Sequence, residues 1–439
     1  MAETALVWLR NDLRIADNPA LTAAFTGGGR VVAVHIEETD GALRPRGSAS
    51  RWWRHHSLKA MARDLAAVGI WLETTEGLAE QTLLSTVKKL GATAVFWNRR
   101  YAPAERMIDA AIKERLRSEH IAAESFPGNV LIEPFDIETR SGGPYAVYTP
   151  FWNALKDRDI PTPHPSPHRH GAPLKADAVD IAYKTPAWAE KFAQYWKIGE
   201  QAARERLHDF LDSDVAAYPE GRDVPSHDVT SRLSPHLAHG EISARQIWHA
   251  AHLLAHREPR KADAVRKFLM ELAWRDFHIH QLYHRDDIAT VPMQAKFADL
   301  EWRTSKADLS AWQRGETGIP IVDAGMRELW ETGFMHNRVR MLVASLLTKN
   351  LLLDWRLGEQ WFWDCLVDAD TANNPGNWQW VAGCGNDAAP YFRIFNPLIQ
   401  ANKFDPAGAY VQRWAPEPRQ PIVNLKTSRE RALAAFKAL

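Results

Sequence analysis

The sequence predicts two domains of different class: an α/β domain with a doubly wound parallel sheet, followed by an all-α domain. In the first third of the chain, short apolar segments alternate with amphipathic ones, as strands and helices do in a parallel sheet. A segment dense in proline and histidine, residues 160–173, then interrupts this alternation. After about Thr185, apolar residues recur at intervals of three and four, which indicates helices.

The alternation defines the elements of the first domain. Four apolar runs are expected to be buried strands: Ala5–Leu9, Val31–Ile36, Ile70–Thr74 and Ala94–Trp97. Three amphipathic segments are expected to be helices: Arg51–Val68, Leu78–Leu90 and Ala104–Glu119. Gly27–Gly29 precedes a strand instead of following one, so it does not match a dinucleotide-binding loop. In such a sheet a ligand would bind beyond the carboxyl ends of the strands, where residues 10–18 and 98–101 lie.

The proline-rich segment 160–173 cannot form a helix or a central strand, so we interpret it as part of a surface connector. Its histidines, His164, His168 and His170, have no cysteine or carboxylate neighbours that would suggest a metal site. The helices expected beyond it include Ala187–Asp212, Ser243–His256, Ala262–His284, Lys306–Arg314, Ile321–Thr332, His336–Leu352 and Gly358–Leu366. The expected bounds are 1–130 for the α/β domain, 131–185 for the connector and 186–439 for the helical domain.

Composition excludes several classes of protein. The 439 residues carry 54 Lys and Arg against 54 Asp and Glu, so the surface is not uniformly basic, although a local basic groove is compatible with this balance. Only two cysteines occur, and no long apolar run or basic leader is present, so we expect a cytoplasmic, monomeric protein without disulfides or membrane spans. The 19 tryptophans are an unusual number and suggest stacking surfaces.

Two groups of residues on the expected helices could form a binding site. Thr230–Ser234 places hydroxyls and backbone amides before Pro235, which suits an anion or a plain helix cap. Glu271, Trp274 and Arg275 lie three and four residues apart on one helix face. They suit either a cleft that stacks a flat ring or a surface ion pair beside a core tryptophan.

Two further groups are rich in arginine and amides. His336–Met341 carries an asparagine and two arginines, whose guanidinium groups bind phosphate or carboxylate in a bidentate manner. Asp368–Trp380 combines acids, amides and two indoles, which suits sugar hydroxyls and a heteroaromatic ring better than acid–base or metal chemistry. Hydrolase triads, Walker loops and Cys-x-x-Cys motifs are absent from the sequence. These residue types indicate a site for a large conjugated cofactor.

In order and spacing, seven motifs resemble the DNA photolyase/cryptochrome family: TSRLS, ELAWRDF, GIPIVDAGMREL, TGFMHNRVRM, LLLDWRLGEQWF, NWQW and DAAPYFRIFNP. The resemblance runs from VWLRNDLRIADNPAL (Val7–Leu21) to the region of Arg393, and is greatest to bacterial class I or class III cyclobutane pyrimidine dimer photolyases. It implies an α/β antenna domain and a helical domain that holds FAD in a U-shaped conformation. It also implies deoxyribodipyrimidine photo-lyase activity on UV-damaged DNA, in which photoexcited reduced FAD passes an electron to a flipped-out dimer and recovers it after the ring splits.

The resemblance implies roles for individual residues. It places FAD against Tyr218, Thr230, Ser231, Arg232, Leu233, Ser234, Arg275, Asn337, Arg340, Asp368, Asp370 and Asn374. Asp368 would pair with Arg340, and Asn374 would lie beside flavin N5. Because every such position lies at or beyond Tyr218, we expect the helical domain alone to bind FAD and the first domain to contribute only an antenna.

The lesion pocket is implied to comprise Glu271, Trp274, Arg275, Asn337, Met341 and Trp380, with Arg222, Arg338 and Arg393 near DNA phosphates or at the pocket rim. Glu271 would stabilise the dimer radical anion, acting with Asn337 and Asn374 as the catalytic residues. Trp378, Trp355 and Trp302 would form an electron-transfer chain from flavin to surface. The resemblance implies no metal.

Two other activities and the antenna stay open. A cryptochrome-type photoreceptor without repair activity is one alternative, although Asn374, the complete lesion pocket and the short C-terminal region favour repair. A (6–4) photoproduct lyase would carry two consecutive histidines where this chain has His336 and Asn337. Glu105 resembles a glutamate that contacts methenyltetrahydrofolate, but Ile288 and Ala289 stand near the place of the family's Cys-Lys pair. Folate is therefore favoured, with 8-hydroxydeazaflavin or no antenna as alternatives.

Overall fold

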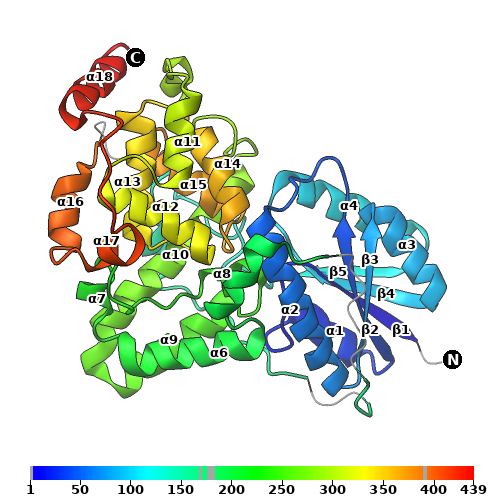
Figure 1. Ribbon diagram of the computed structural model, residues 1–439. Coiled ribbons are helices and arrows are strands. Elements are labelled where there is room, and N and C mark those ends of the chain that lie inside the picture. Colours follow the sequence, from blue (N-terminus) through cyan, green and yellow to red (C-terminus); the bar gives the residue numbers. More distant parts are fainter. Residues whose placement is uncertain (1–2, 168–170, 176–182, 389–392) are drawn as a thin grey trace.

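The computed structural model describes residues 3–167, 171–175, 183–388 and 393–439, and it has the two predicted domains (Figure 1). His168 and His170 of the connector, and residues 389–392 of the last motif, lie outside the described residues. The first domain contains a five-stranded parallel sheet in the order β3-β2-β1-β4-β5. Its strands are β1 (Thr4–Leu9), β2 (Arg30–Glu38), β3 (Trp71–Gly77), β4 (Ala92–Asn98) and β5 (Ala122–Phe126). The chain builds outward from β1 in both directions, which makes the sheet doubly wound.

Helices cover both faces of this sheet. They are α1 (Pro19–Thr26), α2 (Ser48–Ala67), α3 (Ala79–Leu90) and α4 (Pro103–Ser118). Alternate residues of a strand point to opposite faces, so Val7 and Leu9 of β1 pack with α1 and α2, whereas Leu6 and Trp8 pack with α3 and α4. Both α1 and β5 are absent from the sequence prediction, because α1 is short and β5 is an edge strand with little apolar character.

The second domain is helical. Its α-helices are α5 (Tyr148–Leu155), α6 (Glu200–Asp209), α7 (Tyr218–Gly221), α8 (Ser234–His239), α9 (Ala244–Arg257), α10 (Ala262–His284), α11 (Lys306–Arg314), α12 (Pro320–Thr332), α13 (Asn337–Ser345), α14 (Trp355–Cys365), α15 (Asn373–Ala382), α16 (Pro397–Phe404), α17 (Ala409–Trp414) and α18 (Leu425–Lys437). Single 3-10 or π-helical segments are η1 (Ala187–Gln194), η2 (Phe210–Asp214), η3 (Pro259–Lys261), η4 (Ala295–Asp299) and η5 (Leu346–Asn350).

The single helix expected over Ala187–Asp212 is wrong. The chain forms the 3-10 helix η1, leaves it, and begins α6 only at Glu200. Gly199 has a φ of +112°, a conformation that other residues rarely adopt, so the break is fixed at this residue.

The segment expected as a connector, residues 131–185, belongs in part to the helical core. Leu131, Ile137, Phe151 and Leu155 are buried in one cluster with residues of α9 and α10. Helix α5 lies within this segment and packs on α10. A boundary at residue 185 would therefore remove one wall of the helical domain's core.

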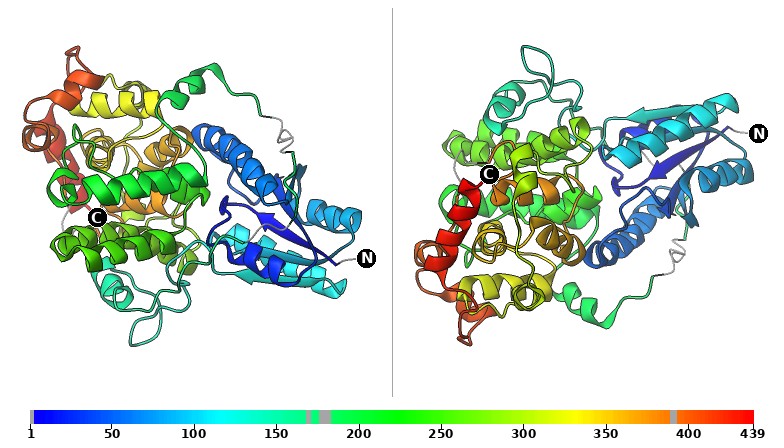
Figure 2. Two further views of the ribbon diagram at one scale, coloured as in Figure 1. Left: turned by 90° about the horizontal axis from the view of Figure 1, so that it is seen from below. Right: turned by 90° about the horizontal axis from the view of Figure 1, so that it is seen from above.

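The carboxyl ends of the strands face the helical domain, and the N-terminus lies at the far end of the sheet (Figure 2). Residues 10–18, expected beside a ligand, are instead largely buried at this contact. Asp17 is fully buried there, where it accepts hydrogen bonds from Ser243 Oγ at 2.5 Å and from the His164 amide at 3.0 Å, and forms an ion pair with Arg245 at 3.0 Å.

Two glycines allow the domains to approach closely. A Cβ atom on Gly47, at the start of α2, would lie 1.8 Å from the carbonyl oxygen of Trp363 in α14. A Cβ atom on Gly240, just after α8, would lie 2.0 Å from the carbonyl oxygen of Asn11. Each domain therefore supplies one glycine against which the backbone of the other domain rests.

We expect Asp17→Asn to lower the free energy of unfolding by about 3–5 kcal/mol, because Arg245 would remain buried without its counter-charge. Asparagine keeps the size of the side chain and tolerates the φ of +51° at this position. Urea unfolding followed by far-ultraviolet circular dichroism measures the change.

The matched control is Asp263→Asn, which breaks an exposed ion pair with Arg266 and should cost less than about 1 kcal/mol. Equal unfolding midpoints for the two variants would show that the Asp17 pair does not stabilise the domain contact.

Candidate functional site

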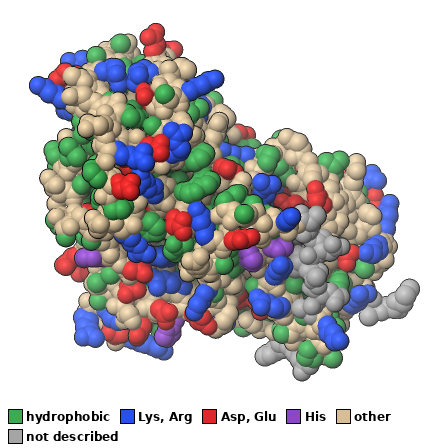
Figure 3. All heavy atoms as spheres, viewed as in Figure 1, with side chains coloured by type: hydrophobic (Ala, Val, Ile, Leu, Met, Phe, Trp, Pro, Cys, Tyr) green, Lys and Arg blue, Asp and Glu red, His purple; other side chains and the backbone are tan. Residues whose placement is uncertain are grey.

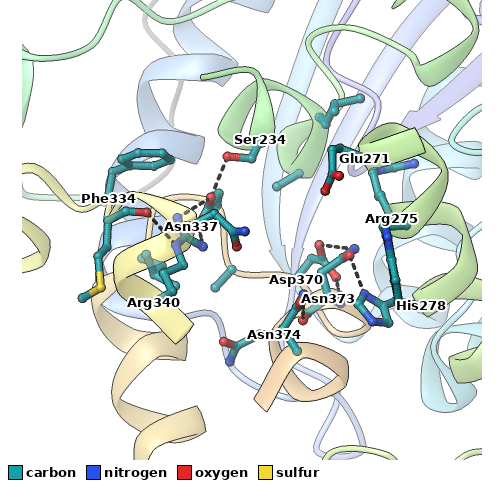
Figure 4. Close-up of a pocket in the computed structure, with 18 of the residues that line it drawn as sticks. Ser234, Glu271, Arg275, His278, Phe334, Asn337, Arg340, Asp370, Asn373 and Asn374 are labelled. Carbon is teal, nitrogen blue, oxygen red and sulfur yellow. Dashed lines mark hydrogen bonds and ion pairs between the residues drawn. The ribbon is translucent and has the colours of Figure 1, made fainter. Parts of the chain in front are cut away.

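The helical domain encloses a cavity of about 500 Å³, lined chiefly by α8, α10, α13, α14 and α15 (Figure 4). The predicted residues on its wall are Tyr218, Arg222, Ser231, Leu233, Ser234, Glu271, Trp274, Arg275, Asn337, Arg338, Arg340, Met341, Asp368, Asp370, Asn374, Trp378 and Trp380. Residues more than 160 positions apart in the sequence therefore meet around one space.

A buried carboxylate organises one side of the cavity. Asp368 accepts two hydrogen bonds from the guanidinium of Arg340, at 2.8 and 3.2 Å, and one from Ser234 Oγ at 2.6 Å. Arg340 Nε also donates to the carbonyl oxygen of Met335 at 2.7 Å. These bonds fix the arginine and the serine in position, which Figure 4 shows for Ser234 and Arg340.

The start of α15 forms a second polar group. Asp370 accepts hydrogen bonds from the amides of Ala372 and Asn373 at 2.8 and 2.6 Å, so its carboxylate caps this helix. Asn373 Nδ2 donates to Asp370 at 2.9 Å, and Asn373 Oδ1 lies 3.0 Å from Nδ1 of His278. Burial lowers the pKa of His278, so the imidazole is neutral at pH 7. Sequence reasoning missed both His278 and Asn373, although His278 lies four residues after Trp274.

Asn374 reaches a residue that the sequence did not suggest. Its Nδ2 donates to the Glu359 carboxylate at 2.7 Å and to the Glu359 carbonyl oxygen at 3.0 Å. The same carboxylate accepts two hydrogen bonds from Arg44 of the α/β domain, at 2.7 and 2.8 Å. Nothing in the local sequence around Arg44 or Glu359 indicates that they meet.

The other side of the cavity carries aromatic groups and a second acid. Trp274 stacks on Tyr148, with ring centroids 3.9 Å apart and planes inclined by 9°. Glu271 forms an ion pair with Arg222. Arg338 pairs with Asp223 at 2.8 Å. Tyr148 was missed because it lies in the expected connector.

Three of the residues predicted to bind FAD or DNA do not line the cavity. The carbonyl oxygen of Thr230 accepts a hydrogen bond from Arg206, and Arg232 pairs with Asp228 at 3.0 Å. Arg393 is exposed, and its carbonyl oxygen accepts a hydrogen bond from Lys349. A sequence motif places neighbouring residues near a site without fixing which side chains point into it, and this explains these three cases.

The three predicted chain tryptophans differ in burial. Trp378 lines the cavity and Trp355 is fully buried, whereas Trp302 is half-buried. Trp378 contacts Phe362, with ring centroids 5.0 Å apart, and a Cβ on Gly358 would lie 2.1 Å from its ring. The indole N–H groups of Trp355 and Trp378 have no acceptor among the described residues.

Glu105 lies far from this cavity, in the first turn of α4. It accepts a hydrogen bond from the Ala102 amide at 3.3 Å and lies 3.9 Å from Arg100. In the described part of the chain, no cluster of His, Cys, Asp and Glu could hold a metal ion. No described helix is long and apolar enough to cross a membrane.

Comparisons with known proteins agree with this geometry. The family model for the FAD binding domain of DNA photolyase matches residues 268–420, and the DNA photolyase model matches residues 5–168. The deoxyribodipyrimidine photo-lyase of Agrobacterium fabrum is 44% identical, covering 99% of this chain and 98% of its own. The crystal structure of a bacterial class III photolyase from Agrobacterium tumefaciens matches with a TM-score of 0.93 and 42% identity, over 100% of this chain and 98% of that one.

A cryptochrome from Synechocystis also matches, with a TM-score of 0.88 and 29% identity over 99% of both chains. The relationship extends through both domains, and the family models cover the α/β domain as well as the part of the cavity wall from residue 268 onward. The chain belongs to the DNA photolyase family.

Proposed function

We propose that this chain is a deoxyribodipyrimidine photo-lyase that repairs cyclobutane pyrimidine dimers in UV-damaged DNA, with FAD bound in the cavity of the helical domain. The observation that carries the proposal is the arrangement of that cavity. A polar network around Asp368 lies on one side of the cavity. The wall of the cavity also includes Trp274, Trp380 and Glu271. This combination suits a flavin nucleotide together with a flipped-out pyrimidine dimer.

The cavity fits the cofactor in size and in chemistry. Its volume lies within the range usual for cofactor sites. Arg340, Ser234 and Asp368 give the cofactor a polar surface, and Phe362 and Trp378 offer apolar surface to a conjugated ring. Thr230 and Arg232 are left out of the proposed set because they do not line the cavity. Bound FAD in its reduced form would supply an electron to the dimer on illumination and recover it after repair.

The protein's part in the reaction is to extract, stack and stabilise the lesion. Stacking on indoles such as Trp274 and Trp380 is worth about 1–3 kcal/mol per base. Glu271 of α10 and Asn337 of α13 both line the cavity and would bond the polar edge of the dimer. Charges of both signs are interspersed over the face shown in Figure 3. For the contact with DNA phosphates we propose the arginines at the cavity, Arg222 and Arg338.

The state of His336 supports a cyclobutane dimer as the substrate. Its Nδ1 accepts a hydrogen bond from the Arg338 amide at 3.2 Å, which caps α13. Burial lowers the pKa of His336 to about 4, so the imidazole carries no second proton at pH 7. Repair of a (6–4) product moves a hydroxyl group and needs a general acid at the lesion. Neither His336 nor Asn337 can serve as that acid.

For the α/β domain we propose an antenna role, with methenyltetrahydrofolate favoured over 8-hydroxydeazaflavin. Support comes from the position of Glu105, although its carboxylate already caps α4 and lies beside Arg100. The absorption spectrum of the purified protein distinguishes the candidates, because folate adds a near-ultraviolet band and deazaflavin a sharper blue-violet band. A spectrum containing flavin bands alone would contradict both antennas.

The substrate is tested with oligonucleotides that each carry one lesion, incubated with pre-reduced protein under blue light. We expect repair of cyclobutane dimers and none of (6–4) products. Because the pKa of His336 is about 4, (6–4) repair should also be absent at pH 6, where this imidazole is still neutral.

Efficient (6–4) repair would refute the proposed specificity. Inactivity on both lesions, with reduced FAD bound, would instead favour the photoreceptor alternative.

Trp355→Phe should abolish light-driven reduction of oxidised FAD but leave dimer repair by pre-reduced protein nearly unchanged. Phenylalanine fills most of the same space but is much harder to oxidise than an indole. Photoreduction in the presence of a thiol donor, followed by flavin absorbance, measures the effect.

Trp312→Phe is the matched control. Trp312 is equally buried and contacts Trp378, with ring centroids 6.1 Å apart, but lies outside the proposed chain. If the two variants lose photoreduction to the same extent, the assignment of Trp355 to the chain is wrong.

A further inference from the structure

Arg44 connects the α/β domain to the wall of the helical cavity. It lies after β2, and its two terminal nitrogens bond both oxygens of Glu359 at 2.7 and 2.8 Å. Glu359 lies on α14, and its side chain is only 2% exposed. The third partner of this carboxylate is Asn374 on α15, which lines the cavity. A continuous series of hydrogen bonds therefore runs from one domain to the cavity of the other.

The loop that carries Arg44 is held firmly on α14. The guanidinium of Arg44 lies 4.0 Å above the centre of the Trp363 ring, and the indole N–H of Trp363 donates to the carbonyl oxygen of Pro45 at 2.8 Å. Ser48 bonds Asp364 through both its amide and its hydroxyl, at 2.8 and 2.7 Å. Arg44 thus reaches Glu359 from a fixed position.

Two oxygen acceptors of Glu359, one on the side chain and one on the backbone, determine how the Asn374 amide is turned. An ionised carboxylate only accepts hydrogen bonds, so it must face the NH₂ end of the amide. Both hydrogens of that NH₂ group are used, one by the carboxylate and one by the carbonyl oxygen of Glu359. The amide oxygen is then the atom left for the cavity. Arg44 supplies the counter-charge of this buried carboxylate and holds both of its oxygens in place.

We propose that Arg44 is a positioning residue for the flavin site: through Glu359 it holds Asn374 with its oxygen toward the cofactor. The inference rests on the proposed binding of FAD beside Asn374. An oxygen at this place accepts a hydrogen bond from the N5–H of reduced flavin, which oxidised flavin lacks, so it favours the reduced form. The α/β domain thereby contributes to flavin chemistry independently of any antenna, contrary to the expectation that it supplies the antenna alone.

The test is the midpoint potential of bound FAD, measured in the full-length protein against reference dyes. In Arg44→Met, the Glu359 carboxylate loses its bidentate partner and is no longer fixed beside Asn374. The amide of Asn374 then keeps only the backbone carbonyl oxygen of Glu359 as a fixed acceptor, so its orientation is held less firmly. We expect the midpoint potential to fall and the reduced flavin to reoxidise in air several-fold faster. Arg44→Lys keeps the charge but not the bidentate contact, and should retain FAD with a smaller shift in the same direction.

Two comparisons separate this role from simple domain docking. Asp364→Asn weakens the neighbouring contact with Ser48 without touching Asn374, and it should leave the potential unchanged. Glu359→Gln should lower the potential as Arg44→Met does, and the double variant should show no further shift, because both changes act through one carboxylate.

The inference is overturned if Arg44→Met and Arg44→Lys both keep the midpoint potential of the unmodified protein. It is also overturned if Asp364→Asn shifts the potential as much as Arg44→Met does, or if the shifts of Arg44→Met and Glu359→Gln add in the double variant. These outcomes leave the proposed function intact as long as the unmodified protein binds FAD and repairs dimers. Failure of the unmodified protein to bind FAD would refute the proposed function itself.

Discussion

A carboxylate is costly to bury unless cations or several donors meet it, and this cost organises both the cavity and the contact between the domains. Asp368 is met by Arg340 inside the cavity, and Asp17 is met by Arg245 between the domains. Glu359 links the cavity and the domain contact, because it bonds Asn374 on the cavity wall while its arginine comes from the other domain. The partners of each pair lie far apart in the sequence. The cavity therefore has its final electrostatics only after the two domains have docked.

Most of the fold could be predicted from local patterns in the sequence. The strands around β1 are continuous apolar runs because both faces of the sheet are covered by helices. The edge strand β5 escaped prediction because it is short and its sequence, AAESF, contains no run of large apolar residues. The break before α6 escaped it because one glycine, Gly199, outweighs the helical periodicity on either side. In each case a single residue or the position at the sheet edge determined the structure. The spacing of apolar residues over ten or so positions does not reveal such effects.

The candidate site could be predicted where its residues share one helix or one motif. Glu271 and Trp274 are neighbours on α10 because of helical spacing alone. Tyr148, which stacks on Trp274, comes from a segment with no visible link to that helix. Arg44 and Glu359 are 315 residues apart, and their meeting depends on how the domains dock. Contacts of this kind are set by tertiary structure, so the sequence alone could not reveal them.

The two glycines at the domain contact limit how this chain could be recombined with its relatives. The backbone of the helical domain packs directly against Gly47, and the backbone of the α/β domain packs directly against Gly240. A chimaera that joined one domain to a partner from another lineage would need both small residues, because a side chain at either place would hold the backbones apart. The two positions lie in different domains and must therefore be inherited together. The domains are distinct as folds, but they are not freely interchangeable as evolutionary modules.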